Sequence, residues 1–148
     1  MNRQELTQAR LKTVRDHMAL ECVQDWDGVI NTFAHPRYEM LGGGQVYDGE
    51  KEVRAYFDSS RQAFPDQTND IISLAADEST DIVLVEFYLI GTHLGDYTVR
   101  GTTYPPTGKS FKVRMAATFE FAPGSDKIIS ERPYTDPRAI MAQLGLGG

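Results

Sequence analysis

Cysteine, histidine and long hydrophobic runs are scarce in this sequence, and each scarcity excludes a class of protein. Cysteine occurs once, at Cys22, so no internal disulfide can form, which fits a reducing compartment. The histidines His17, His35 and His93 are widely spaced, and none stands in a zinc-binding motif. No run approaches the about 20 apolar residues of a membrane span, and residues 1–12 lack the apolar core of a secretion signal. We therefore expect a cytoplasmic protein that has no metal, no cofactor and no membrane anchor.

Positive charge is also in short supply. The chain has 15 Lys and Arg against 21 Asp and Glu, a net charge of -6, and no element concentrates the basic residues. Binding to nucleic acid through its phosphates is therefore disfavoured. There is no G-x-S-x-G nucleophile elbow and no dinucleotide-binding glycine fingerprint, and the glycines at 42–44 lack the Lys-Ser/Thr of a phosphate loop. With 148 residues, 41% of them hydrophobic, the chain is expected to form one domain over residues 1–148 that binds small molecules or other proteins.

The first half of the chain has the periodicity of helices. Apolar residues recur at intervals of three and four, and prolines at positions 36 and 65 end two of these segments. Helices are predicted at residues 3–22, 25–33 and 50–64, with a short hairpin at residues 38–47.

From Thr68 onward the hydrophobic period changes to two, which predicts strands. Long strands are expected at residues 82–94, 111–121 and 127–135, followed by a short C-terminal helix. Three N-terminal helices on one side of a long antiparallel sheet form an α+β domain, and strands of this length must bend. We therefore expect a curved antiparallel sheet that encloses a cavity with the helices.

The alternation in the two longest strands indicates which side chains face inward. In the first strand we assign to the interior the set without a charge in mid-strand: Val83, Val85, Phe87, Leu89, Gly91 and His93. The apolar set of the second strand runs from Phe111 to Phe121, and the pattern leaves open whether it faces the cavity or a dimer partner.

The segment of residues 127–136 ends in three functional groups. Strict alternation places Arg132, Tyr134 and Asp136 on one face and Glu131 on the other. That face is either exposed to solvent or forms the polar end of a pocket. Asp136 precedes Pro137, which is the favoured start of a helix, so Asp136 is also a predicted N-cap. An ion pair between Arg132 and Asp136 is a further option.

These motifs in this order resemble a known family. They are a GEKEVRAYF helix, AFPD, a strand ending in GTHLG, PPTGK, and a strand ending in Asp before a short helix that closes with QLG. The sequence is similar to the SnoaL-like polyketide cyclases and related ester cyclases of the nuclear-transport-factor-2-like superfamily. The resemblance implies a cone with an internal hydrophobic pocket and a homodimer formed through the outer sheet face. It also implies ring closure by an intramolecular aldol step, without metal or cofactor, with an aspartate as the acid/base.

The resemblance and the chemistry together suggest roles for several residues. An aldol closure needs a base that removes a proton next to a carbonyl, and a group that holds the resulting enolate. Asp136 is the candidate base and His93 the candidate proton donor, although Asp136 could be only a cap and His93 only a core residue. Arg132 stands where many family members carry Trp. The predicted substrate-binding residues are Arg132, Tyr134, Phe87, Leu89, Tyr38 and Trp26.

Two functions follow as hypotheses. The first is a cofactor-free cyclase or isomerase that acts on a hydrophobic, carbonyl-bearing small molecule. The alternative is a non-catalytic ligand-binding or dimerisation module with the same fold, for which the departure at Arg132 is the best argument. Epoxide hydrolysis would need a second carboxylate near Asp136, and Glu131 is expected on the opposite face of the strand.

Overall fold

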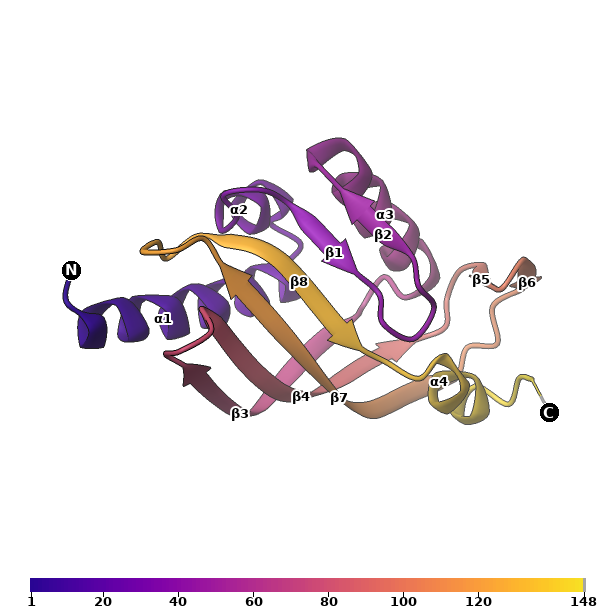
Figure 1. Ribbon diagram of the computed structural model, residues 1–148. Helices are drawn as coiled ribbons and strands as arrows, with labels where there is room; N and C mark the ends of the chain where they lie inside the picture. Colours follow the sequence, from indigo (N-terminus) through magenta and orange to yellow (C-terminus); the bar gives the residue numbers. More distant parts are fainter. Residues whose placement is uncertain (148) are drawn as a thin grey trace.

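Four helices pack against a curved six-stranded sheet in the computed structural model, which describes residues 1–147 (Figure 1). The helices are α1 (Arg3–Cys22), α2 (Trp26–Asn31), α3 (Glu50–Ala63) and α4 (Pro137–Gln143). Three of them begin at a side-chain cap, because Asn2, Asp25 and Asp136 each accept a hydrogen bond from a backbone N–H of the first turn. Within residues 1–147 no helix combines the length and the hydrophobicity needed to cross a membrane.

The main sheet has the strand order β2-β1-β8-β7-β4-β3, and a separate hairpin consists of β5 and β6. The strands are β1 (Arg37–Glu39), β2 (Val46–Asp48), β3 (Thr68–Asp77), β4 (Ile82–Thr92), β5 (Tyr97–Val99), β6 (Thr102–Tyr104), β7 (Ser110–Phe121) and β8 (Ile128–Tyr134). The expected hairpin is present as β1 and β2, and the three expected long strands are present as β4, β7 and β8, with small changes in their ends. The β5–β6 hairpin was not predicted.

The sheet is mixed, which corrects the prediction of an antiparallel sheet. Strand β1 runs parallel to β8, with Tyr38 opposite Glu131. The reason lies in the exit from α2, where the backbone N–H of Ala34 donates to the carbonyl of Ile128 at 2.7 Å and Phe33 forms a parallel bridge to the same residue. The chain is thereby tied to the start of β8 and continues beside it in the same direction.

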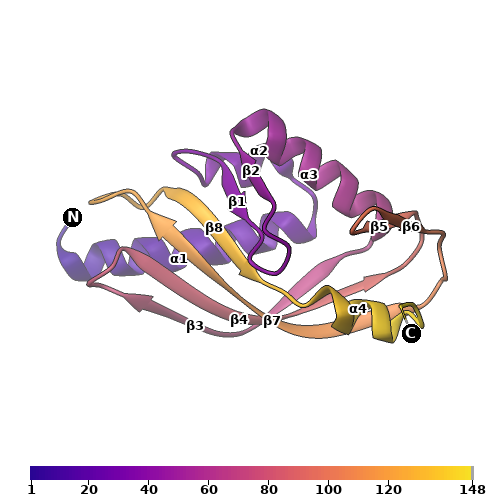
Figure 2. The same ribbon diagram turned by 45° about the vertical axis from the view of Figure 1, so that its right-hand side comes forward.

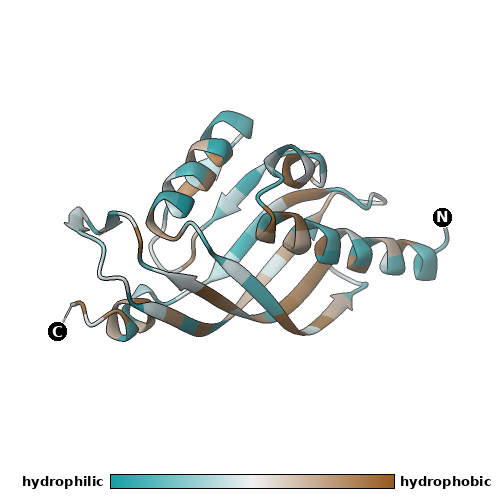
Figure 3. Ribbon diagram, turned by 180° about the vertical axis from the view of Figure 1, so that it is seen from behind, coloured by the Kyte–Doolittle hydropathy of each residue, from teal (hydrophilic) through white to brown (hydrophobic). Residues whose placement is uncertain are grey.

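All three of the first helices cover one face of the sheet. Figure 2 shows these helices on the same side of the sheet. Val14 of α1, Val29 of α2 and Phe57 of α3 are buried in one core with the inward residues of β4 and β7. The prediction for β4 is confirmed, since Val83 and Phe87 are among these buried residues. Strand β7 turns its apolar set to the same interior, which answers the question that the sequence left open. Figure 3 shows hydrophobic stretches along the strands of the sheet and hydrophilic turns toward the N-terminal end of α1.

A β-bulge changes the facing of side chains along β8. Phe121 of β7 pairs with Ile128, but the preceding residue Glu120 pairs with Ser130, so Ile129 has no partner of its own in this ladder. An extra residue of this kind shifts every later side chain to the other face.

The bulge overturns the alternation predicted for the end of β8. Glu131 and Pro133 are buried on the inner face, and Thr135 lines the cavity beyond them. Arg132 and Tyr134 lie on the outer face instead of the inner one. A strict two-residue period from Ile128 assumed a regular strand, and this strand is irregular.

Candidate functional site

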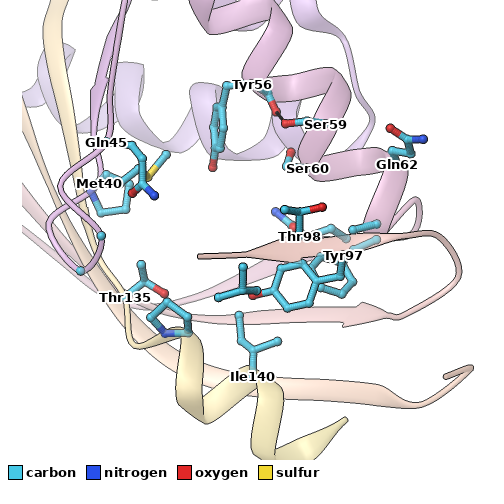
Figure 4. Close-up of a pocket in the computed structure, with 18 of the residues that line it drawn as sticks. Met40, Gln45, Tyr56, Ser59, Ser60, Gln62, Tyr97, Thr98, Thr135 and Ile140 are labelled. Atoms are coloured by element: carbon cyan, nitrogen blue, oxygen red, sulfur yellow. Dashed lines mark hydrogen bonds between the residues drawn. The ribbon is translucent and has the colours of Figure 1, made fainter. Parts of the chain in front are cut away.

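A cavity of about 560 Å³ opens between α3, the β1–β2 turn, the β5–β6 hairpin and α4 (Figure 4). We call it the outer chamber; its walls include Met40, Tyr56, Tyr97, Met115, Pro133 and Ile140. A smaller space of about 60 Å³, the inner chamber, has walls that include Glu21, Tyr38, Tyr56, Arg61, Phe87 and Glu131. The two chambers share Tyr56, Gln67, Leu89, Met115 and Pro133, so they adjoin. Figure 4 shows Tyr56 projecting from α3 into the cavity, with Thr135 and Ile140 on the opposite side.

Charged groups converge beside the inner chamber. His17 and Glu21 lie one turn apart on α1, on the helix face that also buries Val14 and Met18. The His17 Nε2 atom lies 2.9 Å from Glu131 Oε1 and 3.2 Å from Glu21 Oε1. One imidazole therefore bridges two carboxylates that come from the first helix and the last strand.

Hydrogen bonds fix the protonation of the His17 ring. The Thr32 hydroxyl donates to the carbonyl of Val29 at 2.6 Å, so it can only accept from His17 Nδ1, 2.8 Å away. Because Nδ1 carries a proton and Nε2 faces two carboxylates, the imidazole is held as a cation. The Tyr38 hydroxyl donates to Glu21 Oε1 at 2.8 Å and completes this network.

Burial and charge act against each other on the His17 pKa. Complete burial alone would lower it, but the Glu21 charge and the hydrogen bonds to Glu131 and Glu21 outweigh burial and raise the pKa to about 10. The same contacts lower the pKa of Glu21, against the opposing effect of its burial, with a further contribution from the positive charge of Arg61.

Glu131 shifts in the opposite direction. Its burial and the neighbouring Glu21 charge raise the pKa of this carboxyl, and the His17 cation offsets only part of that effect. Glu131 uses Oε1 for the contact with His17, and a hydrogen bond with Tyr38 also acts to lower its pKa. A carboxyl group with a raised pKa on the wall of a partly apolar chamber has the properties of a general acid or base.

The same trio has a spacing that could hold a metal ion. One ligand atom from each of His17, Glu21 and Glu131 lies within 4.8 Å of the other two. In the structure, hydrogen bonds join these atoms directly. The sequence prediction that no metal binds therefore remains to be tested.

Three of the predicted substrate-binding residues line the inner chamber. Tyr38, Phe87 and Leu89 are all on its walls, and Leu89 also reaches the outer chamber. Trp26 is on neither wall. It stacks on Phe57 with ring centres 4.4 Å apart, and the Arg61 guanidinium lies 5.0 Å from its ring centre.

The other two predicted substrate-binding residues lie on the outer face of the sheet. Arg132 donates to Glu120 at 2.9 Å and to the Thr118 hydroxyl at 3.2 Å, so the ion pair suggested with Asp136 does not form. Tyr134 is 48% exposed. Both residues were expected inside because the bulge in β8 was not foreseen.

Asp136 and His93, the predicted catalytic residues, lie outside the walls of both chambers. Asp136 caps α4, and its Oδ1 accepts from the Arg138 backbone N–H at 3.0 Å, with the side chain 58% exposed. His93 is fully buried, and its Nδ1 accepts from the Thr107 backbone N–H at 3.2 Å. Its ring lies 6.0 Å from that of Tyr97, which lines the outer chamber. The catalytic roles of both residues stay predictions.

Sequence reasoning missed His17, Glu21, Arg61 and Glu131. The sequence did contain a signal for the three residues on helices, because each lies on a helix face whose other residues are mostly apolar. His17 and Glu21 continue the row of Val14, and Arg61 follows Val53 and Phe57 at intervals of four. A charge inside a buried row is rare without a partner or a function.

Comparison with known proteins decides the family. The model of the SnoaL-like polyketide cyclases matches residues 10–144. The chain belongs to this family. No curated protein matches this SnoaL-like chain.

Solved structures resemble this SnoaL-like protein over at least 93% of its length. A protein from Jannaschia sp. CCS1 assigned as a SnoaL-like polyketide cyclase shares 21% identity at a TM-score of 0.83, with 100% of this chain and 99% of that chain covered. One from Xanthomonas campestris pv. campestris, assigned as a polyketide cyclase, shares 19% identity at a TM-score of 0.78, covering 94% and 98%. IdmH from Streptomyces antibioticus, with the same assignment, shares 19% at a TM-score of 0.74, covering 93% and 99%. At these identities the likeness establishes the fold.

Proposed function

We propose that this SnoaL-like protein is a cofactor-free cyclase or isomerase acting on a hydrophobic, carbonyl-bearing small molecule. In this proposal the curved sheet and the helices form a cone whose interior, the two chambers, binds the substrate. The observation that carries it is Glu131, a buried carboxyl group with a raised pKa on the wall of the inner chamber, held by His17. The assignment of structural neighbours as polyketide cyclases supports the same reaction class.

The proposed reaction begins with proton abstraction. The Glu131 carboxylate removes a proton from the carbon next to a substrate carbonyl, and the electron pair of that C–H bond forms the enolate. A carboxylate is a better base when its pKa is raised toward neutral pH. The His17 N–H keeps its hydrogen bond to Glu131 Oε1 and so holds the carboxyl group in place.

Tyr56 is the proposed donor to the enolate oxygen. It is on the walls of both chambers, and burial raises its pKa, so the hydroxyl keeps its proton at neutral pH. In a cyclisation the enolate carbon then attacks a second carbonyl of the same molecule and forms the new C–C bond. The oxygen of that carbonyl takes the proton from Glu131. In an isomerisation Glu131 returns the proton to a different carbon.

Deuterium exchange tests the base directly. In D₂O, the wild-type protein should exchange the protons next to the carbonyl of 1-tetralone, a bicyclic ketone, faster than buffer alone, as followed by NMR. Glu131→Gln should lose this exchange while it still binds the ketone, because an amide cannot accept the proton. Glu86→Gln is a matched control, since Glu86 lies on the outer face of β4, opposite Ala116.

Asp136→Asn separates this proposal from the prediction made from the sequence. If Asp136 were the base, Asp136→Asn would lose exchange and Glu131→Gln would retain it. If the wild-type protein does not exceed the buffer rate, catalysis by this site is contradicted. The non-catalytic binding module then becomes the better account, and native mass spectrometry for a retained ligand would identify what it binds.

The homodimer and the cytoplasmic location remain part of the proposal. The outer sheet face carries Leu84 and Tyr134, which are 46% and 48% exposed, and a second copy packed there would bury them. Sedimentation at micromolar concentration is expected to show a dimer, and a monomer would contradict the proposed interface.

A further inference from the structure

Among residues 1–147, Arg61 is the one charged residue on the inner chamber wall that lacks an ion-pair partner. Its Nη1 donates to the Ser60 hydroxyl at 2.9 Å, but its Nε is buried and has no hydrogen-bond partner within residues 1–147. No carboxylate in those residues comes within 4.0 Å of the guanidinium. A buried cationic donor without a partner is costly, which indicates that a ligand completes it.

The orientation of the guanidinium is fixed by its neighbours. The ring centre of Trp26 lies 5.0 Å from the Arg61 Cζ atom, and the Trp26 ring is itself stacked on Phe57. With Nη1 taken by Ser60, the edge formed by Nε and Nη2 is the one left for a ligand. Two parallel N–H groups on one edge match the two oxygens of a carboxylate.

The charges around the inner chamber change when Glu131 takes up a proton. His17 and Arg61 are cations, and Glu21, with its lowered pKa, is an anion. While Glu131 is the free base the four charges balance, and once it holds the abstracted proton the four residues have a surplus of one positive charge, even though the chain as a whole has a net charge of -6. A substrate carboxylate bound to Arg61 would neutralise that surplus.

The size of the chambers indicates where each part of such a molecule lies. The inner chamber, at about 60 Å³, suits a small polar group, whereas the outer chamber, at about 560 Å³, suits an apolar body of one or more rings.

We propose that the substrate is a hydrophobic keto acid whose carboxylate binds the Nε–Nη2 edge of Arg61 in the inner chamber, with its apolar body in the outer chamber. This inference rests on the proposed function, because it names the substrate class of the same cavity. Arg61 acts in it as a specificity residue, and Glu131 remains the base.

A pair of probes of nearly the same size, one with a carboxylate and one with a neutral amide, tests the inference. Cyclohexanecarboxylate and cyclohexanecarboxamide have nearly the same shape and are transparent where tryptophan absorbs. Trp26 is the single tryptophan of the chain and contacts Arg61, so its emission reports on binding at this residue. The Arg61 Nε–H signal in a ¹⁵N-correlated NMR spectrum reports on the atom itself. The carboxylate should bind at least about tenfold more tightly than the amide and shift that signal.

Variants of two arginines on α3 complete the experiment. Arg61→Gln should remove the preference for the carboxylate, and Arg61→Lys, which keeps the charge but loses the paired donors, should retain only part of it. Arg54→Gln removes the same charge from the same helix, but Arg54 pairs with Asp27 and Glu50 at the surface, so the preference should persist. The NMR signal in the wild-type protein gives the result even if an Arg61 variant fails to fold.

Equal affinity for the two probes, or no response to the carboxylate at tens of millimolar, would overturn the inference. The two proposals fail separately. If Glu131→Gln loses deuterium exchange but the protein shows no preference for the carboxylate probe, Glu131 remains the proposed base and the keto acid substrate is contradicted. If the carboxylate is preferred but Glu131→Gln exchanges at the full rate, the carboxylate site remains and Glu131 as the base is contradicted.

Discussion

Glu131 and Asp136 are two carboxylates on one short stretch of chain, and their surroundings give them opposite characters. Glu131 is 7% exposed, hydrogen bonds to a buried histidine and lines the inner chamber. The Asp136 side chain is 58% exposed and caps a helix. Both are acidic, and both lie near the end of the last strand. Burial and neighbouring charges therefore decide which of them can act as a base. The residue type and the position along the strand do not decide it.

The largest expected effect comes from breaking the network on the buried side of this comparison. His17→Leu leaves Glu21 and Glu131 without their shared cation, and removal of one partner from a buried ion pair costs about 3–5 kcal/mol. Chemical denaturation at neutral pH should show this loss in the free energy of unfolding. A loss below about 1 kcal/mol would mean that the network does not hold the fold.

The pH dependence of stability should also come from the buried network of His17, Glu21 and Glu131. The folded protein keeps a proton on His17 up to pH about 10, whereas the unfolded chain releases it near the ordinary histidine pKa of 6.5. Stability from His17 is therefore complete below pH 6.5 and is lost as the pH rises through 10. Denaturation curves between these values should show a steady decline in the wild-type protein and a weaker one in His17→Leu. Equal slopes would contradict the raised pKa.

In acid the two glutamates act with opposite signs. The lowered pKa of Glu21 gives stability above its ordinary value of 4.5 that is lost as the pH falls. The raised pKa of Glu131 means that the folded state keeps the proton of Glu131 to a higher pH than the unfolded chain does. The contribution of Glu131 to the free energy of unfolding therefore weakens as the pH rises above 4.5. NMR titration of the two side-chain carboxyl carbons should therefore give two separated midpoints.

Substitution of Asp136, the exposed carboxylate, should change the stability of the protein only a little. Asp136→Ala removes the cap of α4 and should cost roughly 1 kcal/mol, whereas Asp136→Asn should cost little, because Asn caps about as well as Asp. Thermal or chemical unfolding of both variants measures this. A loss in Asp136→Asn as large as that in His17→Leu would show that the charge of Asp136 matters beyond the cap.

Arg132 should contribute less to stability than the Asp136 cap does. Its pair with Glu120 lies on the outer face, and the Glu120 side chain is 40% exposed. Pairs of this kind contribute about 0–1 kcal/mol, and salt screens them. Arg132→Gln should therefore leave the melting temperature nearly unchanged, and the deuterium exchange with 1-tetralone should be unchanged.

The smallest expected effect is that of a chelator. If His17, Glu21 and Glu131 share protons rather than a metal, EDTA should leave the melting temperature and the exchange rate as they were. A fall of many degrees would identify this trio as a metal site, since its ligand atoms lie within 4.8 Å of one another.

The sequence predicted the elements of the fold well, because hydrophobic period is a local property. The inward set of β4 followed directly from the absence of charge on one face, as Val83 and Phe87 show. The parallel pairing of β1 with β8 could not be predicted, since it depends on a backbone contact between Ala34 and Ile128.

The site was harder to predict than the fold. Tyr38, Phe87 and Leu89 were expected on the walls and are there. The charged network depends on contacts between residues more than one hundred positions apart, such as His17 and Glu131, which no local pattern reveals. The sequence did offer the buried rows of α1 and α3, but the reading of β8 required knowledge of the bulge.

That bulge at Ile129 makes the chemistry of the cavity depend on one extra residue in the last strand. If all residues of β8 paired regularly from Ile128 onward, Ile129 would take a place in the ladder, Arg132 and Tyr134 would turn inward, and Glu131 would turn out to solvent. The composition would not change, yet the chamber would gain a cation and lose its acid. Deletion of Ile129, by contrast, would make the strand regular and keep Glu131 on the inner face.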